Sequence, residues 1–471
     1  MNHSRFCSLR FVPALLPVVL SLLVTVGCES SLAPLPNICE CRDPSPIASV
    51  PESRRTSTVD VIYATDRRAG EDLDSRLDYT WKRSKSLGFG VARVEFGENL
   101  SWSELVGANG NSHPLRPVNL HLREIEEVGR LSPTPIPLVE GPDGTKIPDP
   151  AIEAKDAIQI AALHELIRSH LEPEDDGRVT VFVHGYNNSF QDSMFVAVQL
   201  SHFTARQGLV IAYSWPAGLG GLRGYTHDRE SGEFTIYHLR KFLRMVAASP
   251  DVRKINVLAH SRGTDVAVTA LREVNMIERS AGRSTRETLK LGHLILAAPD
   301  LDLDVVSQRI SAEYLYTVPE STTIYFSGQD RAIGIADWLF ASALRLGGLR
   351  LDRLDPELRK ALNESPPTIG MIDVHARTGF LGHSYFYQSP AVSSDIYLIL
   401  SEDRLPGAEN GRPLHSEEPG IWIPKDGYPN PPKSLFGRAL VDPAKSDSGE
   451  PGDSAKPYLT DESDQPDPGH P

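Results

Sequence analysis

The sequence predicts an α/β fold with a mostly parallel, doubly wound sheet and helices on both faces. From residue 179 onward, short apolar runs alternate with segments of helical periodicity, which is the pattern of buried parallel strands joined by helices. A serine stands between one such run and the helix that follows it. The composition, 40% hydrophobic and 23% charged, is ordinary for a soluble globular protein.

The N-terminus has the features of an export signal. Arg5 and Arg10 precede an apolar run over 11–26, which is shorter than the roughly 20 residues that a bilayer-spanning helix needs. Gly27-Cys28 at its end resembles a bacterial lipoprotein processing site. We therefore expect cleavage before Cys28, lipidation of that cysteine and a lipid anchor in a membrane of the cell envelope. The alternatives are ordinary secretion, periplasmic or extracellular, and an uncleaved anchor.

Cysteine positions and charge restrict the chemistry. All four cysteines lie in the first tenth of the chain, so neither a thiol mechanism nor a zinc–thiolate site is expected in the folded core. The net charge of −14, with no basic stripe to offset it, argues against a nucleic-acid partner. We expect no metal and no organic cofactor, and the oligomeric state is not predicted.

Composition divides the chain into four parts. After the signal at 1–28, residues 29–58 are rich in proline and serine and are expected to form a flexible linker. Residues 59–402 are expected to form the main domain, which begins with a β-rich extension over 59–150. Residues 403–471 are dominated by proline, glycine, serine and acidic residues, so we expect this tail to be mostly disordered.

Each element of the domain has its own signal. The β-branched and aromatic run at 59–65 predicts a strand, as does the alternation at 87–96. Prolines predict a loop at 131–150, and apolar residues at helical spacing predict a helix at 149–171. Further strands are expected at 179–183, 209–213, 255–259, 291–298, 322–326 and 368–374, and helices at 192–206, 233–248 and 264–274.

The pentapeptide Ala259-His260-Ser261-Arg262-Gly263 has the arrangement of a nucleophile elbow, with small residues two positions either side of the serine. Such a turn strains the serine backbone and directs its Oγ outward at the carboxyl end of a strand, with a helix N-terminus behind it. Ala259 stands where glycine is usual and is still small enough for close packing. Ser261 is therefore the predicted nucleophile.

A serine nucleophile needs a base, and the base needs an orienting acid, which in this fold follow in the chain order serine, acid, histidine. Asp330 directly follows the strand expected at 322–326 and is the predicted acid. His383, preceded by Gly379 and Gly382, is the predicted base. The alternatives that stay open are Asp300 and Asp302 for the acid and His375 for the base.

Two backbone N–H groups should face the developing oxyanion. One is expected from Arg262, directly after the serine. The other is expected from Tyr186, because Gly185 in the loop after the strand at 179–183 permits close approach of the backbone; an ordinary β-turn is the alternative. We expect His184, Gly185 and Trp215 at the pocket, with core packing as the other interpretation of Trp215. The Asp228-Arg229-Glu230 run is interpreted as a salt-bridged helix start.

Several motifs occur together in one order: HGYNNSF at 184–190, SWPAG at 214–218, AHSRGT at 259–264, LAAPDLDLDV at 296–305 and GHSYF at 382–386. With them, residues 59–400 resemble the α/β-hydrolase family of uncharacterised, esterase- or lipase-like proteins known as DUF900. The resemblance implies an α/β-hydrolase fold and a triad of Ser261, Asp330 and His383, but no substrate. Family members usually carry methionine where Arg262 stands; its guanidinium would either select an anionic substrate group or pair with a nearby carboxylate.

The leading hypothesis is a serine hydrolase that cleaves a small-molecule acyl ester through an acyl-enzyme on Ser261. One alternative is a non-enzymatic envelope scaffold or binding lipoprotein that keeps the fold. Another is an acyltransferase or thioesterase with the same triad. The presence of every proposed triad residue favours an enzyme.

Overall fold

The computed structural model describes residues 30–71, 76–109, 117–330, 333, 345–350, 356–375, 383–425 and 427–429. All of these belong to one folded unit, Met1–Asn430. The expected signal peptide, Cys28 and the tail beyond residue 430 lie outside the described residues. Among the helices that are described, none combines the length and apolar character that crossing a bilayer requires.

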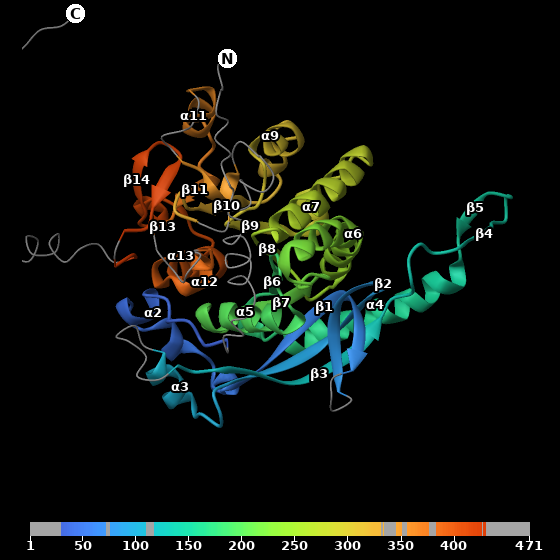
Figure 1. The fold of residues 1–471 in the computed structure, drawn as a ribbon, viewed down its shortest axis with the longest axis horizontal. Coiled ribbons are helices and arrows are strands. Elements are labelled where there is room, and N and C mark those ends of the chain that lie inside the picture. Colours follow the sequence, from blue (N-terminus) through green and yellow to red (C-terminus); the bar gives the residue numbers. More distant parts are fainter. Residues whose placement is uncertain are drawn as a thin grey trace, which may run out of the picture. The chain divides into compact units, whose positions relative to one another are not determined.

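An eleven-stranded sheet forms the centre of this unit (Figure 1), in the order β14-β15-β11-β10-β9-β8-β6-β7-β1-β2-β3. Strands β15 to β1 of that order run parallel, while β2, β3 and β14 pair antiparallel at the two edges. The mostly parallel α/β class predicted from the sequence is confirmed. The strands are β1 Thr58–Glu71, β2 Leu77–Phe96, β3 Leu120–Arg130, β6 Arg178–Val183, β7 Leu209–Ser214, β8 Lys254–His260, β9 Leu291–Ala297, β10 Ser321–Phe326, β11 Ile369–Asp373, β14 His415–Glu418 and β15 Ile421–Ile423.

Helices cover both faces of the sheet, as the term doubly wound requires. Alternate side chains of one strand point to opposite faces of the sheet. Val181 and Val183 of β6 therefore belong to the apolar cluster on one face, and Phe182 belongs to the cluster on the other. The first cluster contains α4 Pro150–His170, α6 Gly221–Ala248 and α7 Gly263–Ser280; the second contains α5 Phe190–Phe203 and α13 Pro390–Glu402. Strands apolar on both sides are what produced the unbroken apolar runs in the sequence.

Local signals fix where these helices begin. Ser189 caps α5, because its Oγ accepts from the Asp192 amide while the Asp192 carboxylate accepts from the Ser189 amide. Asp149 caps α4 and Pro150 occupies its first position, where the missing N–H costs nothing. Helix α6 begins twelve residues before the expected start at 233. The sequence did not predict its first turns, because Gly220, Gly221 and the polar residues after them show no apolar helical spacing.

The β-rich extension is part of the main sheet. Strand β1 pairs parallel with β7, so the long β1–β2–β3 meander continues the sheet from its parallel part. The proline-rich segment at 131–150, expected to be a loop, contains a short hairpin of β4 Leu138–Glu140 and β5 Lys146–Pro148. Figure 1 shows this hairpin beyond the start of α4, projecting from the body of the protein.

The expected flexible linker is wrong for residues 30–58. The short helix α2 Ile38–Cys41 packs on α13, since the Ile38 amide donates to Ser394 Oγ over 3.1 Å. Leu35, Ile47 and Val50 are also buried in the core. Proline and serine dominate the composition of this segment, but apolar residues spaced along it provide enough buried area to hold it on the domain.

The expected disordered tail is wrong for residues 403–425. This segment supplies β14 and β15, which extend the main sheet beyond β11. It also supplies Arg412, whose Nη2 lies 2.6 Å from Asp395 Oδ2, with both side chains fully buried. Tyr428 donates to the same carboxylate over 2.5 Å. A high share of proline, glycine and acidic residues did not reveal these pairings, which join positions far apart in the sequence.

Candidate active site

Ser261 lies at the turn between β8 and α7, as the elbow pattern predicts. Its φ is +52°, in the left-handed region that a side chain other than glycine rarely occupies. The turn is held on both sides of the serine: its amide donates to the Ala297 carbonyl over 2.9 Å, and Thr264 Oγ1 donates to its carbonyl over 2.6 Å. Surrounding hydrogen bonds thus maintain a backbone conformation that is unfavourable by itself.

Small residues flank the serine for steric reasons. A Cβ on Gly263 would lie 2.2 Å from the carbonyl oxygen of His184, so no side chain fits there. Ala259, where glycine is usual, is fully buried in β8 and its methyl group packs in the apolar cluster beneath α7. The fold therefore accommodates an alanine at position 259 but requires a glycine at position 263.

His383 and Asp330 form a hydrogen-bonded pair. His383 Nδ1 lies 2.7 Å from Asp330 Oδ2, and the Asp330 side chain is fully buried while that of His383 is 16% exposed. The Ile333 amide donates to the other carboxylate oxygen over 3.2 Å. Because a carboxylate accepts only, Nδ1 carries the proton and Nε2 is free to accept one. Among the described residues no hydrogen bond joins Ser261 Oγ to His383; such contacts commonly tighten only when substrate binds.

His260 connects this pair to the elbow. The ring of His260, the residue before Ser261, lies 4.7 Å from the ring of His383, and its Nε2 is 3.2 Å from the His383 carbonyl oxygen. Burial, together with the neighbouring His383, holds the pKa of His260 well below its ordinary value. His260 therefore stays neutral and donates its proton to that carbonyl. The elbow and the His383–Asp330 pair meet at the carboxyl edge of the sheet.

The alternative acids and base have other partners. Asp300 accepts from Tyr225 Oη over 3.0 Å and forms a short ion pair with Arg345. Asp302 caps the short helix α9 Leu303–Val306. His375 is 60% exposed in its side chain and lies 3.3 Å from Asp373. None of the three alternatives is hydrogen-bonded to the Asp330–His383 pair in the part of the chain that is described.

The loop at 184–188 follows β6 and lies against the elbow. A Cβ on Gly185 would stand 2.7 Å from Ser261 Cβ, which explains the glycine. Asn187 adopts a φ of +56°, and the Asn188 side chain accepts from the Gly185 amide over 3.2 Å. No described residue accepts a hydrogen bond from the amides of Tyr186 or Arg262. Within the described chain, the amide directly after Ser261 and the amide after Gly185, which packs against Ser261, are thus two backbone donors without a partner.

His184 and Trp215 lie beneath this loop and not at an open surface. Both are fully buried, and their rings stack 5.1 Å apart at an angle of 5°. Trp215 Nε1 donates to the His184 carbonyl over 2.7 Å. Two of the three residues predicted at the pocket, His184 and Trp215, instead support the 184–188 loop from the core side.

Asp228 also holds this loop, which the sequence did not indicate. Its Oδ2 accepts from the amides of Asn187, over 2.9 Å, and Gly218, over 3.3 Å. Asp228 lies fully buried inside α6, not at a helix start, while Arg229 and Glu230 are exposed. The run was interpreted as a salt-bridged helix start, because nothing in the local pattern distinguishes a buried carboxylate from its exposed neighbours.

Arg262 pairs with a carboxylate one helical turn away. Its Nη2 lies 2.9 Å from Asp265 Oδ2, and its side chain is 12% exposed. Burial acts to lower the pKa of Arg262, but Asp265 and Asp300 nearby raise it further than burial lowers it. This is the second of the two roles considered for the guanidinium.

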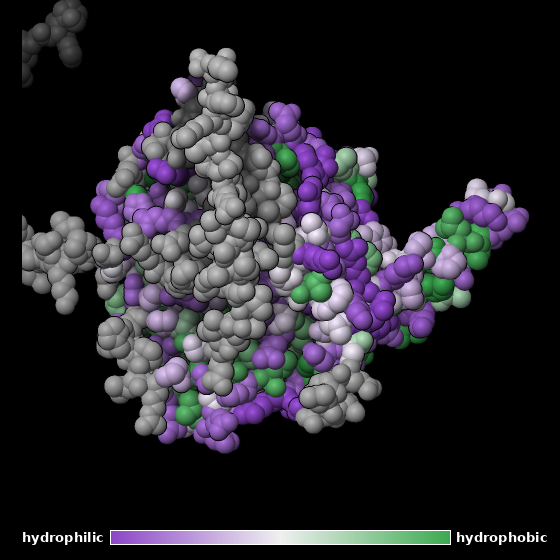
Figure 2. Space-filling view, in the orientation of Figure 1, coloured by the Kyte–Doolittle hydropathy of each residue, from purple (hydrophilic) through white to green (hydrophobic). Residues whose placement is uncertain are grey.

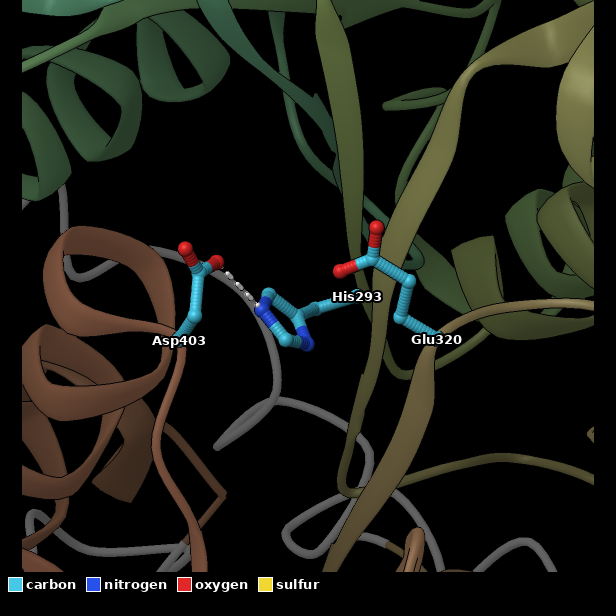
Figure 3. A group of neighbouring side chains, drawn as sticks. All are labelled: His293, Glu320 and Asp403. Carbon is cyan, nitrogen blue, oxygen red and sulfur yellow. Dashed lines mark hydrogen bonds and ion pairs between the residues drawn. The ribbon is translucent and has the colours of Figure 1, made fainter.

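His293, Glu320 and Asp403 bring one ligand atom each within 4.8 Å of the others (Figure 3), an arrangement that metal sites share. Their oxygens, however, already bond to cations: Lys254 Nζ lies 2.7 Å from Glu320 and 3.0 Å from Asp403. His293 lies near the start of β9 and Glu320 directly before β10, whereas Ser261 follows the end of β8. The cluster joins the end of α13 to the amino edge of the sheet, opposite the carboxyl edge that carries Ser261.

A strained serine at a strand–helix turn, a histidine–carboxylate pair beside it and a parallel sheet covered on both faces define an α/β hydrolase. The chain belongs to the family of α/β hydrolases of unknown function known as DUF900, whose family model matches residues 159–402. A comparison with curated proteins gives no significant match.

Proposed function

We propose that this α/β hydrolase is a serine esterase that cleaves small-molecule carboxylic esters through an acyl-enzyme on Ser261. The observation that carries the proposal is the strained Ser261 backbone at the same sheet edge as a His383–Asp330 pair of 2.7 Å. Residues held in such sparsely populated conformations cluster at active sites, which supports a catalytic role for this serine.

Each residue has one role in the proposed reaction. Ser261 Oγ attacks the ester carbonyl carbon while its proton passes to His383 Nε2, and Asp330 keeps the imidazole in the tautomer that can accept it. The amides of Tyr186 and Arg262 stabilise the oxyanion. The proton on His383 then leaves with the alcohol, and water, activated by the same histidine, releases the acid and restores Ser261.

The test is covalent labelling of the full-length protein with a fluorophosphonate probe. We expect labelling and ester hydrolysis by the wild type and none by Ser261→Ala or His383→Ala, with all three folded by circular dichroism. A folded wild type that neither labels at Ser261 nor hydrolyses a panel of short- and long-chain acyl esters would overturn the proposal and favour the scaffold function. Adding alcohols or thioesters to the same assay separates an acyltransferase or a thioesterase from an esterase.

We further propose that the protein is exported and anchored to a membrane of the cell envelope through a lipid on Cys28. The folded part supports a short tether, since the Leu120 amide donates to the Ser30 carbonyl over 2.8 Å and the chain enters the domain there. The mass of the mature N-terminus tests this proposal. We expect a lipid-modified Cys28; an unmodified residue other than Cys28 at the N-terminus would reject it.

A further inference from the structure

We propose that Arg67, far from Ser261 in the sequence, is a positioning residue that sets the direction of the Tyr186 amide through His184. This inference rests on the proposed function, because it assigns a role in stabilising the oxyanion. Arg67 lies in β1, in the Thr65-Asp66-Arg67 stretch that directly follows an apolar run. The sequence alone attached no function to it.

Arg67 is a fully buried guanidinium, and every hydrogen bond it donates to a described residue goes to a neutral acceptor. It is 1% exposed, and burial lowers its pKa to about 10, so it remains protonated at neutral pH. Two of its bonds secure the 214–217 loop: Nε donates to Ser214 Oγ over 2.9 Å and Nη1 to the Ala217 carbonyl over 2.7 Å. A buried charge without a carboxylate partner is costly, so its retention calls for a reason other than stability.

The remaining donor, Nη2, serves the 184–188 loop. It lies 2.8 Å from the Asn188 carbonyl oxygen and 3.2 Å from His184 Nε2. His184 Nε2 also lies 3.2 Å from the Trp215 carbonyl oxygen, while Nδ1 lies 2.9 Å from the Gly185 carbonyl oxygen. A guanidinium only donates, so a proton on Nδ1 satisfies both the Arg67 contact and the shorter carbonyl contact, whereas a proton on Nε2 satisfies only the Trp215 contact. His184 Nε2 therefore accepts from Arg67 and carries no proton. Burial, with a contribution from Arg67, lowers the pKa of His184 to about 3, so a second proton is not taken up at neutral pH. Arg67 therefore fixes the His184 tautomer.

The fixed tautomer determines what the other ring nitrogen does. With Nε2 unprotonated, Nδ1 carries the proton and donates to the Gly185 carbonyl over 2.9 Å. The Gly185 carbonyl and the Tyr186 N–H belong to the same peptide plane and point to opposite sides of it. Holding that carbonyl against His184 therefore directs the Tyr186 N–H away from the core. Rotation of this plane would remove one of the two donors proposed to bind the oxyanion.

Lysine cannot replace this function. A guanidinium donates from three nitrogens in a rigid planar fork, and Arg67 uses that fork to bond the 214–217 and 184–188 loops at once. A lysine ammonium is a compact group on a flexible stem and would reach some of these acceptors only. Arg67→Lys is thus a variant that keeps the buried charge and loses the geometry.

The test compares Arg67→Gln and Arg67→Lys with a matched control, Arg83→Gln, in the full-length protein. Arg83 lies opposite Arg67 in the β1–β2 register but bonds to Ser231 and not to the 184–188 loop. The assays are kcat and KM for a short-chain ester, and the affinity for a trifluoromethyl ketone, which forms a tetrahedral adduct with the serine. Circular dichroism and urea unfolding of each variant show that it is folded.

For both Arg67 variants we expect kcat to fall about 100-fold, which is the size of effect seen when one oxyanion donor is lost, with KM changed less than about threefold. Ketone affinity should fall in parallel. His184→Asn should give a similar loss, and the double variant with Arg67→Lys should be no worse than the poorer single one. Folded Arg67→Lys protein with wild-type kcat and ketone affinity, or losses that add in the double variant, would overturn the inference. Inactive wild type would instead overturn the proposed function.

Discussion

The α-carbon of Gly263 and the carbonyl oxygen of His184 approach so closely that a Cβ on the glycine would lie 2.2 Å from that oxygen. This contact joins the turn that carries Ser261 to the loop that carries the Tyr186 amide. The spacing between the proposed nucleophile and the proposed oxyanion donor is therefore set by contact between the two backbones.

Gly263→Ala should displace one of these two segments. We expect at least about 2 kcal/mol of destabilisation from overpacking and a loss of esterase activity larger than the loss of folded protein. Urea unfolding and kcat measure the two effects. Gly107→Ala in α3 Trp102–Ala108 is the control, because a Cβ there meets nothing within 4 Å. It should be neutral or stabilising by up to about 1 kcal/mol. Equal effects of the two substitutions would contradict the steric explanation.

Asp330→Asn should reduce kcat by about 100- to 10,000-fold with little change in KM, because an asparagine amide no longer keeps the proton on His383 Nδ1. Asp300→Asn is the matched comparison, since Asp300 accepts from Tyr225 and pairs with Arg345, not with His383. We expect a smaller loss from it, measured with the same ester. If Asp300→Asn were the more damaging change, the assignment of the acid would be reversed.

Stability should depend on pH through His202, which is fully buried and whose ring nitrogens have no hydrogen-bond partner among the residues that the structure describes. Burial, with Arg206 nearby, lowers its pKa to about 3. Between the ordinary histidine pKa and that value the unfolded chain binds a proton that the folded one does not. The free energy of unfolding therefore falls as pH falls, by about 1.4 kcal/mol per pH unit from this group.

Replacing His202 with leucine removes that dependence. We compare the free energy of unfolding of His202→Leu with that of the wild type at each pH. Relative to the wild type, the variant should become more stable by about 3 kcal/mol as the pH falls from 7 to 4. Urea unfolding at several pH values measures it. A difference that stays constant over this range would show that His202 takes up its proton in the folded state.

Arg412→Ala should destabilise the protein by about 3–5 kcal/mol, because it leaves the Asp395 carboxylate buried without its ion pair. Arg404→Ala is the control: its guanidinium lies 3.3 Å from Glu402 and is 48% exposed, so a change below about 1 kcal/mol is expected. Thermal or urea unfolding measures both. Equal stability of the two variants would mean that the segment beyond residue 402 does not contribute to the fold.

Ser261, Asp330 and His383 could be inferred as candidates from the sequence because the first two directly follow strand signals and His383 comes after the strand expected at 368–374, in a fixed chain order. An apolar run predicts a buried strand, and the carboxyl ends of parallel strands meet at one edge. The predicted strands at 179–183, 209–213, 255–259 and 322–326 accordingly match β6, β7, β8 and β10 within one residue at each end.

The supports of the site could not be inferred in this way. His184 and Trp215 were expected at a pocket, and their burial depends on which side of the loop the core lies. Asp228 and Arg67 reach the 184–188 loop from α6 and β1, and no local pattern marks a charged residue whose partners are backbone groups of a distant loop. Likewise, composition suggested that 30–58 and 403–425 were unstructured, because it counts residues and not the partners available to them.

The sequence by itself thus determined the class of fold and the order of the candidate catalytic residues, since periodicity and motif spacing are local properties of the chain. Only the tertiary structure decided how those residues are held: a strained serine fixed by neighbouring strands, Gly263 against His184, and Arg67 against the same loop. Burial and hydrogen bonding between distant segments produce these contacts, and they exist only once the sheet has formed.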